Sequence, residues 1–321
     1  MGKLVIAGGS GFIGRHLIRS LKDNGLEMIV LTRSEGSRSR DPDYRDVRFV
    51  QWTADDPDWI NELAGADAVV NLAGKPIGSG PWTNRSKSLI MSSRVDTVRT
   101  LVNAIQSVSS PPRCYIQASA VGFYGTHTTM NVTENDGPGQ GFLADVCRQW
   151  ESGIIPLNTL GIRSVCLRFG IVLGIHDGFY RRMACLVRHF MGTIIGSGQN
   201  WISWIHYQDV VKIIRRAITD AGMTGAYNAT APQPIQNGPF MHTLAQTWSR
   251  PLLPSPPLFV LRMTLGDMLD ELILASHHVV PHRLLQSAFT FHYSNCGNAL
   301  LQLREECRRR KHPISCPKNP Q

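Results

Sequence analysis

The stretch Gly8-Gly9-Ser10-Gly11-Phe12-Ile13-Gly14, residues 8–14, decides the fold. It follows a short apolar run, residues 3–7, and precedes apolar residues at helical spacing, Leu17, Ile18 and Leu21. A glycine turn between a strand and a helix is the context that a dinucleotide-binding fingerprint requires. There the glycines let the backbone approach a pyrophosphate, and the helix N-terminus offers unpaired N–H groups and a positive dipole end. The sequence therefore predicts a phosphate-binding turn.

Short apolar runs alternate with helical patterns over the first half of the chain. Further strands are predicted at 28–31, 47–50, 68–72, 114–118 and 164–167, and helices at 84–107 and 142–151. Nearly continuous apolar strands that alternate with helices are typical of a parallel sheet covered on both faces. We therefore expect an α/β fold with a doubly wound, Rossmann-like parallel sheet.

Beyond about residue 170 the alternation weakens, and Pro and Gly separate shorter segments. Helices are predicted there at about 178–191, 207–220, 237–248 and 257–275. The domain prediction has three parts: residues 1–170 form a nucleotide-binding domain to which later segments return, residues 171–303 form a smaller, mostly helical substrate domain, and residues 304–321 form a frayed basic tail.

The charge of the chain does not favour a nucleic-acid partner. Among 321 residues, 33 Lys and Arg against 24 Asp and Glu give a net charge of +9. Residues 304–321 hold six basic and two acidic residues, a net +4, which leaves +5 for the other 303 residues. Because no binding motif is present and no basic face is evident, we expect no nucleic-acid partner.

The chain carries no signal for export, membrane insertion or metal binding. The N-terminus leads directly into residues 3–7, and no apolar run approaches the roughly 18 residues of a membrane span. The seven cysteines are scattered and lack a Cys-x-x-Cys pair. We therefore expect a cytoplasmic protein without a membrane partner and without a metal site.

Arg33 indicates which dinucleotide the turn accepts. The second strand ends at Leu31-Thr32-Arg33, where a protein that binds the 2′-hydroxyl form carries an acidic residue. A guanidinium suits a 2′-phosphate through a bidentate charged contact, so the sequence favours NADP(H) over NAD(H). The alternative is a solvated arginine in a basic loop with Arg38 and Arg40.

Longer segments carry a family resemblance. They are GGSGFIGRHL (8–17), DAVVNLAGKPI (67–77), PW (81–82) leading to SSR (92–94), SAVGFYG (119–125), VTEND (132–136), GFLADVCRQWE (141–151), LRFGIVLG (167–174), IGSGQNWISWIHYQDVV (195–211) and YNATAPQPIQN (227–237). With these, the chain resembles the extended short-chain dehydrogenase/reductase superfamily. More closely, it resembles the atypical epimerase-family branch that includes SDR39U1-type and YfcH-type proteins, over about residues 3–295.

The resemblance implies a set of cofactor-binding residues. Gly8 to Gly14 would hold the pyrophosphate and Thr32 with Arg33 the adenosine phosphate. Leu72-Ala73-Gly74 would line the adenine and ribose side. Two further segments match positions near the cofactor, Arg94 and Arg168-Phe169. A surface charge for Arg94 and a packing role for Leu72 and Ala73 are the alternatives.

The usual catalytic residues of the superfamily are missing. A Tyr-x-x-x-Lys pair on a helix normally lets a lysine lower the pKa of the phenol one turn away. The resemblance places Leu143 and Cys147 at these two positions, and Ala120 at that of the usual Ser or Thr. Hydride chemistry based on a tyrosine is therefore not predicted by this helix.

Weaker candidates for the chemistry remain. Tyr124 follows the fifth strand and is the one candidate catalytic residue that we retain. Lys75 and Lys87 are candidates for an anionic substrate, and His206 with Asp209 and Glu134 with Asp136 are candidate pairs. The alternatives are a solvated surface position for each lysine, a first-turn anion that suits the helix dipole for Asp209, and a polar loop for Glu134 and Asp136. His277 and His278 are adjacent and would point in different directions, so they do not predict a metal site.

Two functions follow from these observations. The first is an NADP(H)-dependent oxidoreductase or epimerase-like protein that acts on an unknown small molecule without the usual Tyr-x-x-x-Lys pair. The second is a non-catalytic NADP(H)-binding redox sensor or interaction protein, which the missing residues favour. The helices at 84–107 and 142–152 imply, by family analogy, a homodimer.

Overall fold

Seven parallel strands form one central sheet in the order β10-β6-β5-β4-β1-β2-β3. In this computed structural model the described residues are 2–22, 24–33, 44–53, 57–78, 80–128, 130–176 and 178–309. The strands are β1 (Lys3–Ala7), β2 (Glu27–Thr32), β3 (Val47–Gln51), β4 (Ala68–Asn71), β5 (Cys114–Ala120), β6 (Arg163–Phe169) and β10 (Gly225–Ala229). The strand order reverses between β1 and β4, which is where doubly wound sheets bind ligands. The predicted Rossmann-like fold is confirmed.

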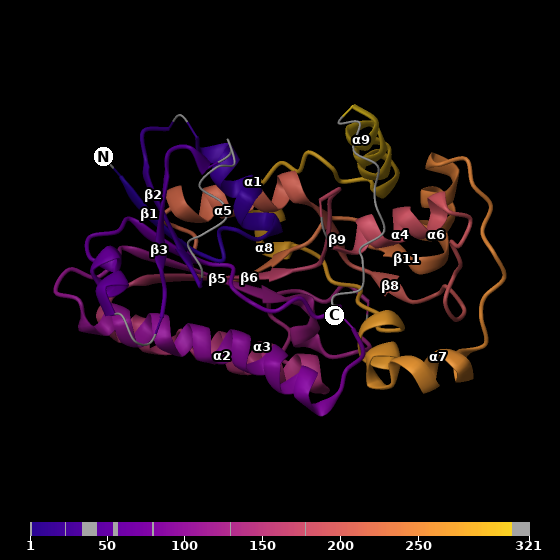
Figure 1. Ribbon diagram of the computed structural model, residues 1–321, viewed down its shortest axis with the longest axis horizontal. Coiled ribbons are helices and arrows are strands. Elements are labelled where there is room, and N and C mark those ends of the chain that lie inside the picture. Colours follow the sequence, from indigo (N-terminus) through magenta and orange to yellow (C-terminus); the bar gives the residue numbers. More distant parts are fainter. Residues whose placement is uncertain are drawn as a thin grey trace.

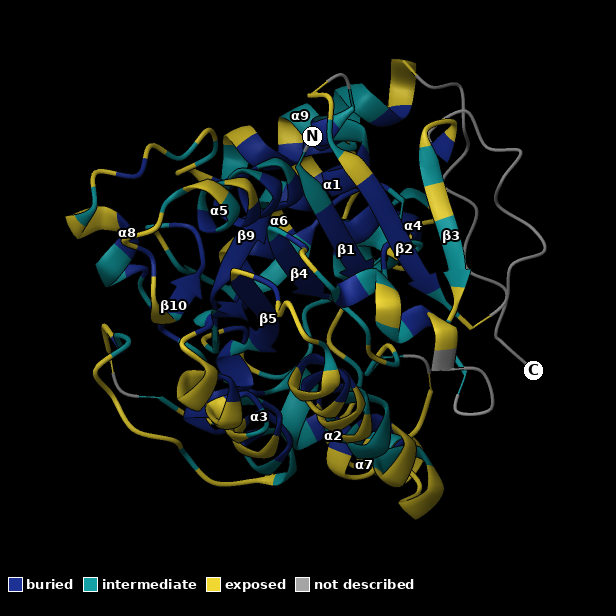
Figure 2. Ribbon diagram, turned by 90° about the vertical axis from the view of Figure 1, so that its left-hand side faces the viewer, coloured by how far each residue is buried: buried dark blue, intermediate teal, exposed yellow. Residues whose placement is uncertain are grey.

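Two pairs of helices cover the two faces of this sheet (Figure 1). Helices α1 (Phe12–Leu21) and α5 (Tyr207–Thr219) pack together on one face, and α2 (Asn84–Ser107) and α3 (Phe142–Ser152) on the other. Because both faces are covered, the central strands are mostly apolar and buried, as at Val5, Val69 and Ile116, and their polar residues Asn71 and Gln117 are buried too. Figure 2 shows the contrast with edge strand β3, which is partly exposed.

A second layer of short elements, which come from the second half of the chain, lies beside the central sheet (Figure 1). It has a core of its own around Tyr180, Trp204, Phe240 and Leu303. Strand β7 pairs with β9 and β8 pairs with β11. These elements are β7 (Ile171–Leu173), α4 (Gly178–Arg188), β8 (Trp201–Ile202), β9 (Trp204–His206), β11 (Ile235–Gln236), α6 (Asn237–Thr247), α7 (Leu258–Leu265) and α9 (Cys296–Arg309). Helix α8 (His282–Gln286) instead lies against β10 of the main sheet, and its Leu284 is buried in the main core.

Short helical turns connect the longer elements. They are η2 (Pro57–Leu63), η3 (Val121–Tyr124), η4 (Ile155–Leu160) and η5 (Leu269–Ile273). The helix predicted at 257–275 is instead divided into α7 and η5, because Gly266 adopts a left-handed φ of 54° that ends α7.

The chain after residue 303 does not fray at once. Helix α9 continues to Arg309, and Cys307 is buried in the second core. The predicted tail therefore begins with a packed helical turn, and residues 310–321 lie outside the described residues. Within the described residues no helix is both long and apolar enough to cross a membrane.

Candidate functional site

The turn between β1 and α1 is built so that three of its glycines cannot be replaced without a clash. Gly8 has a φ of 77°, and a Cβ atom there would lie 2.7 Å from the carbonyl carbon of Leu72. A Cβ atom on Gly9 would lie 2.7 Å from a methyl group of Val30. A Cβ atom on Gly14 would lie 2.5 Å from the Cα atom of Gly9. The turn is therefore pressed against β2, the end of β4 and its own helix, as a dinucleotide turn requires.

Helix α1 begins at this turn without a side-chain cap. Gly11 is its N-cap, contributes no side-chain cap, and no acidic residue lies in the first turn. The N–H of Gly11 donates to the carbonyl of Gly8 at 2.9 Å, which closes the turn. The Phe12 ring packs against His16 and Tyr207, and Ile13 packs against the main core. The N–H groups of this turn, rather than its side chains, are therefore the candidate donors for an anion.

The end of β4 lies against the glycine turn, at the reversal of strand order where doubly wound sheets form their ligand crevice. Leu72 donates its N–H to the carbonyl of Ala7 at 2.8 Å, and the Ala73 N–H donates to the Asn71 side chain at 3.1 Å. Leu72 and Ala73 pack against the main core, so the packing role and the wall role hold together. Gly74 is exposed. The structure thus brings the two predicted segments, 8–14 and 72–74, into direct backbone contact.

Arg33 lies at the same edge of the sheet, directly after Thr32 at the end of β2. The Thr32 carbonyl accepts a hydrogen bond from the Trp52 N–H at 2.7 Å, which fixes the strand end. The Arg33 side chain is exposed and forms no ion pair with any residue that the structure describes. It is available to a phosphate beside β2, and the neighbouring Arg38 and Arg40 lie outside the described residues.

Arg94 projects from α2 toward the end of β4. Its guanidinium carbon would lie 3.2 Å from a Cβ atom placed on Gly74, and it lies 5.1 Å from the centre of the Trp150 ring. Its Nη1 donates to the carbonyl of Ile90 at 3.1 Å. Arg94 is therefore not a charge on the outer surface of α2; it fills the space between α2, α3 and residues 72–74.

Arg168 forms a buried ion pair at the end of β6. Its Nε and Nη2 donate to the two oxygens of Glu151 at 2.9 and 2.8 Å, and its Nη1 donates to the Tyr124 hydroxyl at 2.8 Å. Its guanidinium carbon lies 3.5 Å from the centre of the Phe123 ring. Glu151 also accepts from the Ser119 hydroxyl at 2.7 Å. Phe169, the next residue, is buried in the main core.

Tyr124 is held by this network as a neutral phenol. Its hydroxyl donates to the Asn228 side-chain oxygen at 2.8 Å while it accepts from Arg168. Burial, opposed by Arg168, raises the pKa of Tyr124 to about 12. A phenol with that pKa is a poor base near neutral pH, because the best base has a pKa near the working pH. The geometry favours a positioning role for Tyr124 over the catalytic role that we considered.

Leu143 and Cys147 are the residues of helix α3 that the resemblance places at the positions of a Tyr-x-x-x-Lys pair. A Cβ atom on Gly122 would contact Leu143 and the Cys147 sulfur at 3.3 and 3.9 Å. Burial raises the pKa of the Cys147 thiol to about 11, so the thiol stays protonated. Neither side chain supplies a proton relay or a positive charge at this position.

The other candidate pairs have structural roles. His206 caps α5 by accepting the Gln208 N–H, and Asp209 accepts the N–H groups of His292 and Tyr293 at 2.7 and 3.0 Å. Burial raises the pKa of Asp209 above its ordinary value, and the two backbone bonds oppose this rise. The contacts of His206 and Asp209 hold separate segments together and do not form a catalytic pair.

The carboxylates of Glu134 and Asp136 also have structural roles. Glu134 accepts the N–H groups of Asn228 and Arg283, whereas Asp136 accepts the Thr133 N–H. These contacts follow the polar-loop alternative.

The two candidate lysines differ in their contacts. The Lys87 amino group forms an ion pair with Asp267. The backbone N–H of Lys75 donates to the Ser93 hydroxyl at 3.0 Å, whereas the amino group of Lys75 forms no hydrogen bond or ion pair with any residue that the structure describes. Lys75 thus remains available at the crevice.

The two adjacent histidines have different partners. His277 contacts the carbonyl of Gly125 at 2.6 Å, and His278 accepts the N–H of Asn131 at 3.0 Å. Across the described part of the chain, no group of three or more His, Cys, Asp or Glu residues is placed to hold a metal ion.

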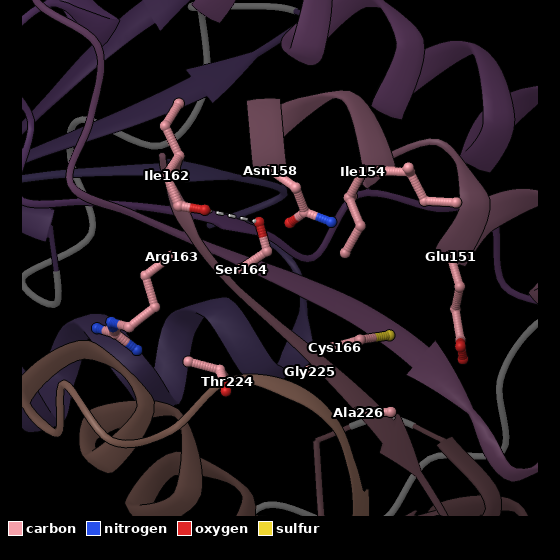
Figure 3. A pocket seen from close by; sticks show the side chains of 11 residues that line it. Glu151, Ile154, Asn158, Ile162, Arg163, Ser164, Cys166, Thr224, Gly225 and Ala226 are labelled. Carbon is pink, nitrogen blue, oxygen red and sulfur yellow. Dashed lines mark hydrogen bonds between the residues drawn. The ribbon is translucent and has the colours of Figure 1, made fainter. Parts of the chain in front are cut away.

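A groove of about 470 Å³ lies away from the glycine turn, over β6 and β10 (Figure 3). One wall comes from the end of α3 and from η4, and the floor from the first residues of β6 and β10. Its lining residues are Glu151, Ile154, Ile155, Asn158, Ile162, Arg163, Ser164, Cys166, Thr224, Gly225 and Ala226. Glu151 belongs both to this groove and to the Arg168 network.

Comparisons with known proteins come from family models and from individual relatives. The model of the NAD dependent epimerase/dehydratase family matches residues 4–229, and that of a domain of unknown function, DUF1731, matches residues 256–303. The epimerase family protein YfhF of Bacillus subtilis is 36% identical over 301 residues, 94% of this chain and 97% of that protein. The chloroplastic SDR39U1 homolog of Arabidopsis thaliana is 35% identical and covers 92% of this chain and 84% of its own length.

A solved structure extends the similarity to three dimensions. The crystal structure of the human epimerase family protein SDR39U1 with NADPH superposes with a TM-score of 0.80. The two chains are 26% identical, and the match covers 94% of this chain and 99% of the human one. The similarity therefore includes both the sheet and the smaller second layer.

Proposed function

Because the chain belongs to the NAD dependent epimerase/dehydratase family, in the atypical branch that includes SDR39U1, we propose that it is an NADP(H)-dependent oxidoreductase or epimerase-like protein acting on a small molecule. The observation that carries the proposal is the turn at residues 8–14. A Cβ atom on Gly8, Gly9 or Gly14 would clash, and α1 begins there without a side-chain cap. This close, donor-rich backbone fits a pyrophosphate.

The proposed cofactor is NADP(H) rather than NAD(H). Arg33 is exposed at the end of β2, without an ion-pair partner among the described residues, and a guanidinium there suits a 2′-phosphate. The similar human protein was crystallised with NADPH, which supports the same choice for this chain. Thr32 and residues 72–74 would line the adenosine half.

The proposed division of labour between cofactor and chain is as follows. Bound NADP(H) would exchange a hydride with a carbon of the substrate. The N–H groups of the turn would hold the pyrophosphate, and Arg33 the 2′-phosphate. The Arg168 network would keep Phe123 and Tyr124 in place beside the crevice, with the Tyr124 proton directed at Asn228. Tyr124 would therefore orient neighbouring groups and not remove a proton.

A second candidate function is favoured by helix α3. Leu143 and the protonated Cys147 thiol replace a tyrosine and a lysine, and the Tyr124 hydroxyl is already engaged on both sides. A non-catalytic NADP(H)-binding sensor or interaction protein needs no acid or base at this point. In that case the cofactor would stabilise one conformation of the chain through ligand linkage.

One experiment separates the two functions. The purified chain is titrated with NADPH while tryptophan fluorescence and the melting temperature are followed. It is then incubated with a panel of carbonyl compounds and nucleotide sugars while the absorbance of reduced nicotinamide is recorded. Binding with turnover supports the enzyme, and binding without turnover on any panel member supports the sensor. Absence of NADPH binding would overturn both.

A further inference from the structure

The groove over β6 and β10 (Figure 3) lies on the same face of the sheet as the Arg168 network. In the register of the two strands, Ala226 is the partner of Cys166, and Asn228 is the partner of Arg168. Alternate residues of a strand point to the same face, so Cys166 and Ala226 share the face of Arg168 and Asn228. The groove therefore begins where the network ends, and Glu151 belongs to both.

Small side chains leave the floor of the groove hollow. The strand residues that line it include Ser164, Cys166, Gly225 and Ala226, and their side chains do not fill the space beside α3 and η4. Its volume of about 470 Å³ lies within the range of sites for small organic molecules, roughly 300–1,000 Å³. The groove is thus large enough for a small ligand.

The walls of the groove are largely apolar. Ile154 and Ile162 are buried, whereas Ile155, which also lines the groove, is 60% exposed. Covering an exposed aliphatic side chain with an apolar ligand is favourable, because it removes that surface from water. The groove therefore fits a ligand with an apolar body.

The Glu151 carboxylate supplies a hydrogen-bond acceptor at this apolar groove. Its Oε1 accepts bonds from Ser119 and Arg168, whereas its Oε2 accepts one, from Arg168 at 2.8 Å. The Cys166 thiol also interacts with Glu151, and burial raises the pKa of this thiol well above its ordinary value. The thiol therefore stays protonated, and it is only a weak donor. A ligand hydroxyl is a stronger donor that can take its place at Glu151.

The charges around the groove favour a neutral ligand. Glu151 is already paired with Arg168, so an ammonium group would lose its hydration without gaining an unpaired counter-ion. The guanidinium of Arg163, which lines the groove, donates to the carbonyls of Met223 and Ile218 at 2.9 and 3.2 Å. An anionic ligand would lie near the Glu151 carboxylate, while the Arg163 guanidinium is engaged elsewhere.

We propose that this groove binds a small, neutral and largely apolar molecule with one hydroxyl group, and that the hydroxyl donates to Glu151. The site is separate from the glycine turn, and the inference does not depend on a bound cofactor. Arg168 joins Glu151 to the Tyr124 hydroxyl. A ligand in the groove would therefore contact the carboxylate that holds Tyr124 in place through Arg168.

Three probes that share one cyclohexane ring test the charge preference. They are cyclohexanol, cyclohexylamine and cyclohexanecarboxylate, and their binding at neutral pH is followed by ligand-detected NMR titration. We expect cyclohexanol to bind with a dissociation constant in the millimolar range, since it is a very small ligand, and the two charged probes to bind at least about fivefold more weakly. Absence of saturable cyclohexanol binding, or tighter binding of either charged probe, would overturn the proposal.

Two exposed aliphatic residues of η4 form a matched pair of variants, because Ile155 lines the groove and Leu160 does not. Ile155→Ala should weaken cyclohexanol binding at least about threefold, roughly the effect of one buried methylene, and Leu160→Ala should leave it unchanged. Ala226→Leu fills the floor of the groove and should abolish binding. Equal effects of Ile155→Ala and Leu160→Ala would mean that the probe binds elsewhere, and the proposal would be wrong.

Sedimentation of the chain without a probe tests the other occupant of an apolar groove, a second copy of the chain. We expect Ile155→Ala to leave the sedimentation coefficient unchanged. Self-association that Ile155→Ala abolishes would assign the groove to a contact between copies and would contradict a small-molecule site.

Discussion

Glu151 is the residue on which the Arg168 network depends. It accepts two of the three hydrogen bonds that the Arg168 guanidinium donates, as well as that of the Ser119 hydroxyl, and its side chain is 14% exposed. The charge of Arg168, 7% exposed, has its counter-ion in this carboxylate. Removing one partner of a buried pair leaves an uncompensated charge, which is costlier than the pair itself is favourable.

We predict that Glu151→Gln lowers the free energy of unfolding by about 3–5 kcal/mol. The control is Asp145→Asn, because Asp145 forms an exposed pair with Arg148 on the same helix. That change should cost less than about 1 kcal/mol. Urea denaturation of both variants measures the difference, and equal small effects would show that Arg168 does not depend on Glu151.

At the residue scale the sequence predicted the backbone sites better than the buried partners. Glycines 8, 9 and 14 lie close together between an apolar strand and a helical pattern, so the turn could be predicted from their spacing and its local context. Glu151 and Asn228 lie 17 residues before Arg168 and 104 residues after Tyr124, and no local pattern joins them. The signal that was available is physical: an arginine at the end of a buried strand requires a nearby carboxylate.

At the element scale, His206 sets a pH dependence of helix α5. It is fully buried, caps the helix through Nδ1 and contacts Gln302 through Nε2 at 2.9 Å. Burial lowers the pKa of His206 from 6.5 to about 3, although Gln302 opposes this. Between pH 6.5 and about pH 3, His206 binds a proton in the unfolded chain but not in the folded chain. This contribution to stability is therefore complete above pH 6.5 and is lost as the pH falls toward 3.

We predict that stability falls by about 2 kcal/mol more in the natural chain than in His206→Asn between about pH 7.5 and about pH 5. Asparagine keeps a capping oxygen but does not titrate. Denaturation midpoints of both proteins at the two pH values test this. An equal loss of stability in the natural chain and in His206→Asn would mean that other groups cause the acid sensitivity.

Helix α9 gives a second prediction at this scale. Leu303 is completely buried in the second core, whereas Leu301 on the same helix is 44% exposed. Leu303→Ala should cost about 2–5 kcal/mol, because it leaves a cavity, and Leu301→Ala much less. Thermal melting of the two variants is the comparison, and similar losses would contradict the packing of α9.

The elements were predicted where periodicity is strong and missed where a single residue overrides it. The 24 residues of α2 were predicted correctly, since a long apolar stripe marks them. The prediction of one helix at 257–275 was wrong because Gly266, with its left-handed φ, interrupts an apolar pattern that would otherwise continue. The charged residues at 304–309 predicted a frayed tail and gave no indication that Cys307 is buried on a helix.

At the scale of the whole molecule, the parallel sheet could be predicted because alternating buried strands and helices have few stable arrangements. The return of β10 to pair with β6 required tertiary contacts that alternation alone does not specify. The same holds for the crevice: Gly8, Gly74, Arg33 and Arg94 come from four separate segments. The reversal of strand order between β1 and β4 brings the ends of those segments together.

The central claim is that this crevice binds NADP(H) and selects it through Arg33. The most direct measurement is calorimetric titration of the natural chain and of Arg33→Asp with NADPH and NADH. The account predicts that the natural chain binds NADPH at least about tenfold more tightly than NADH, and that Arg33→Asp removes this preference, since charge-assisted hydrogen bonds contribute about 1.5–3 kcal/mol. Equal affinities in the natural chain, or a preference that Arg33→Asp leaves unchanged, would contradict it.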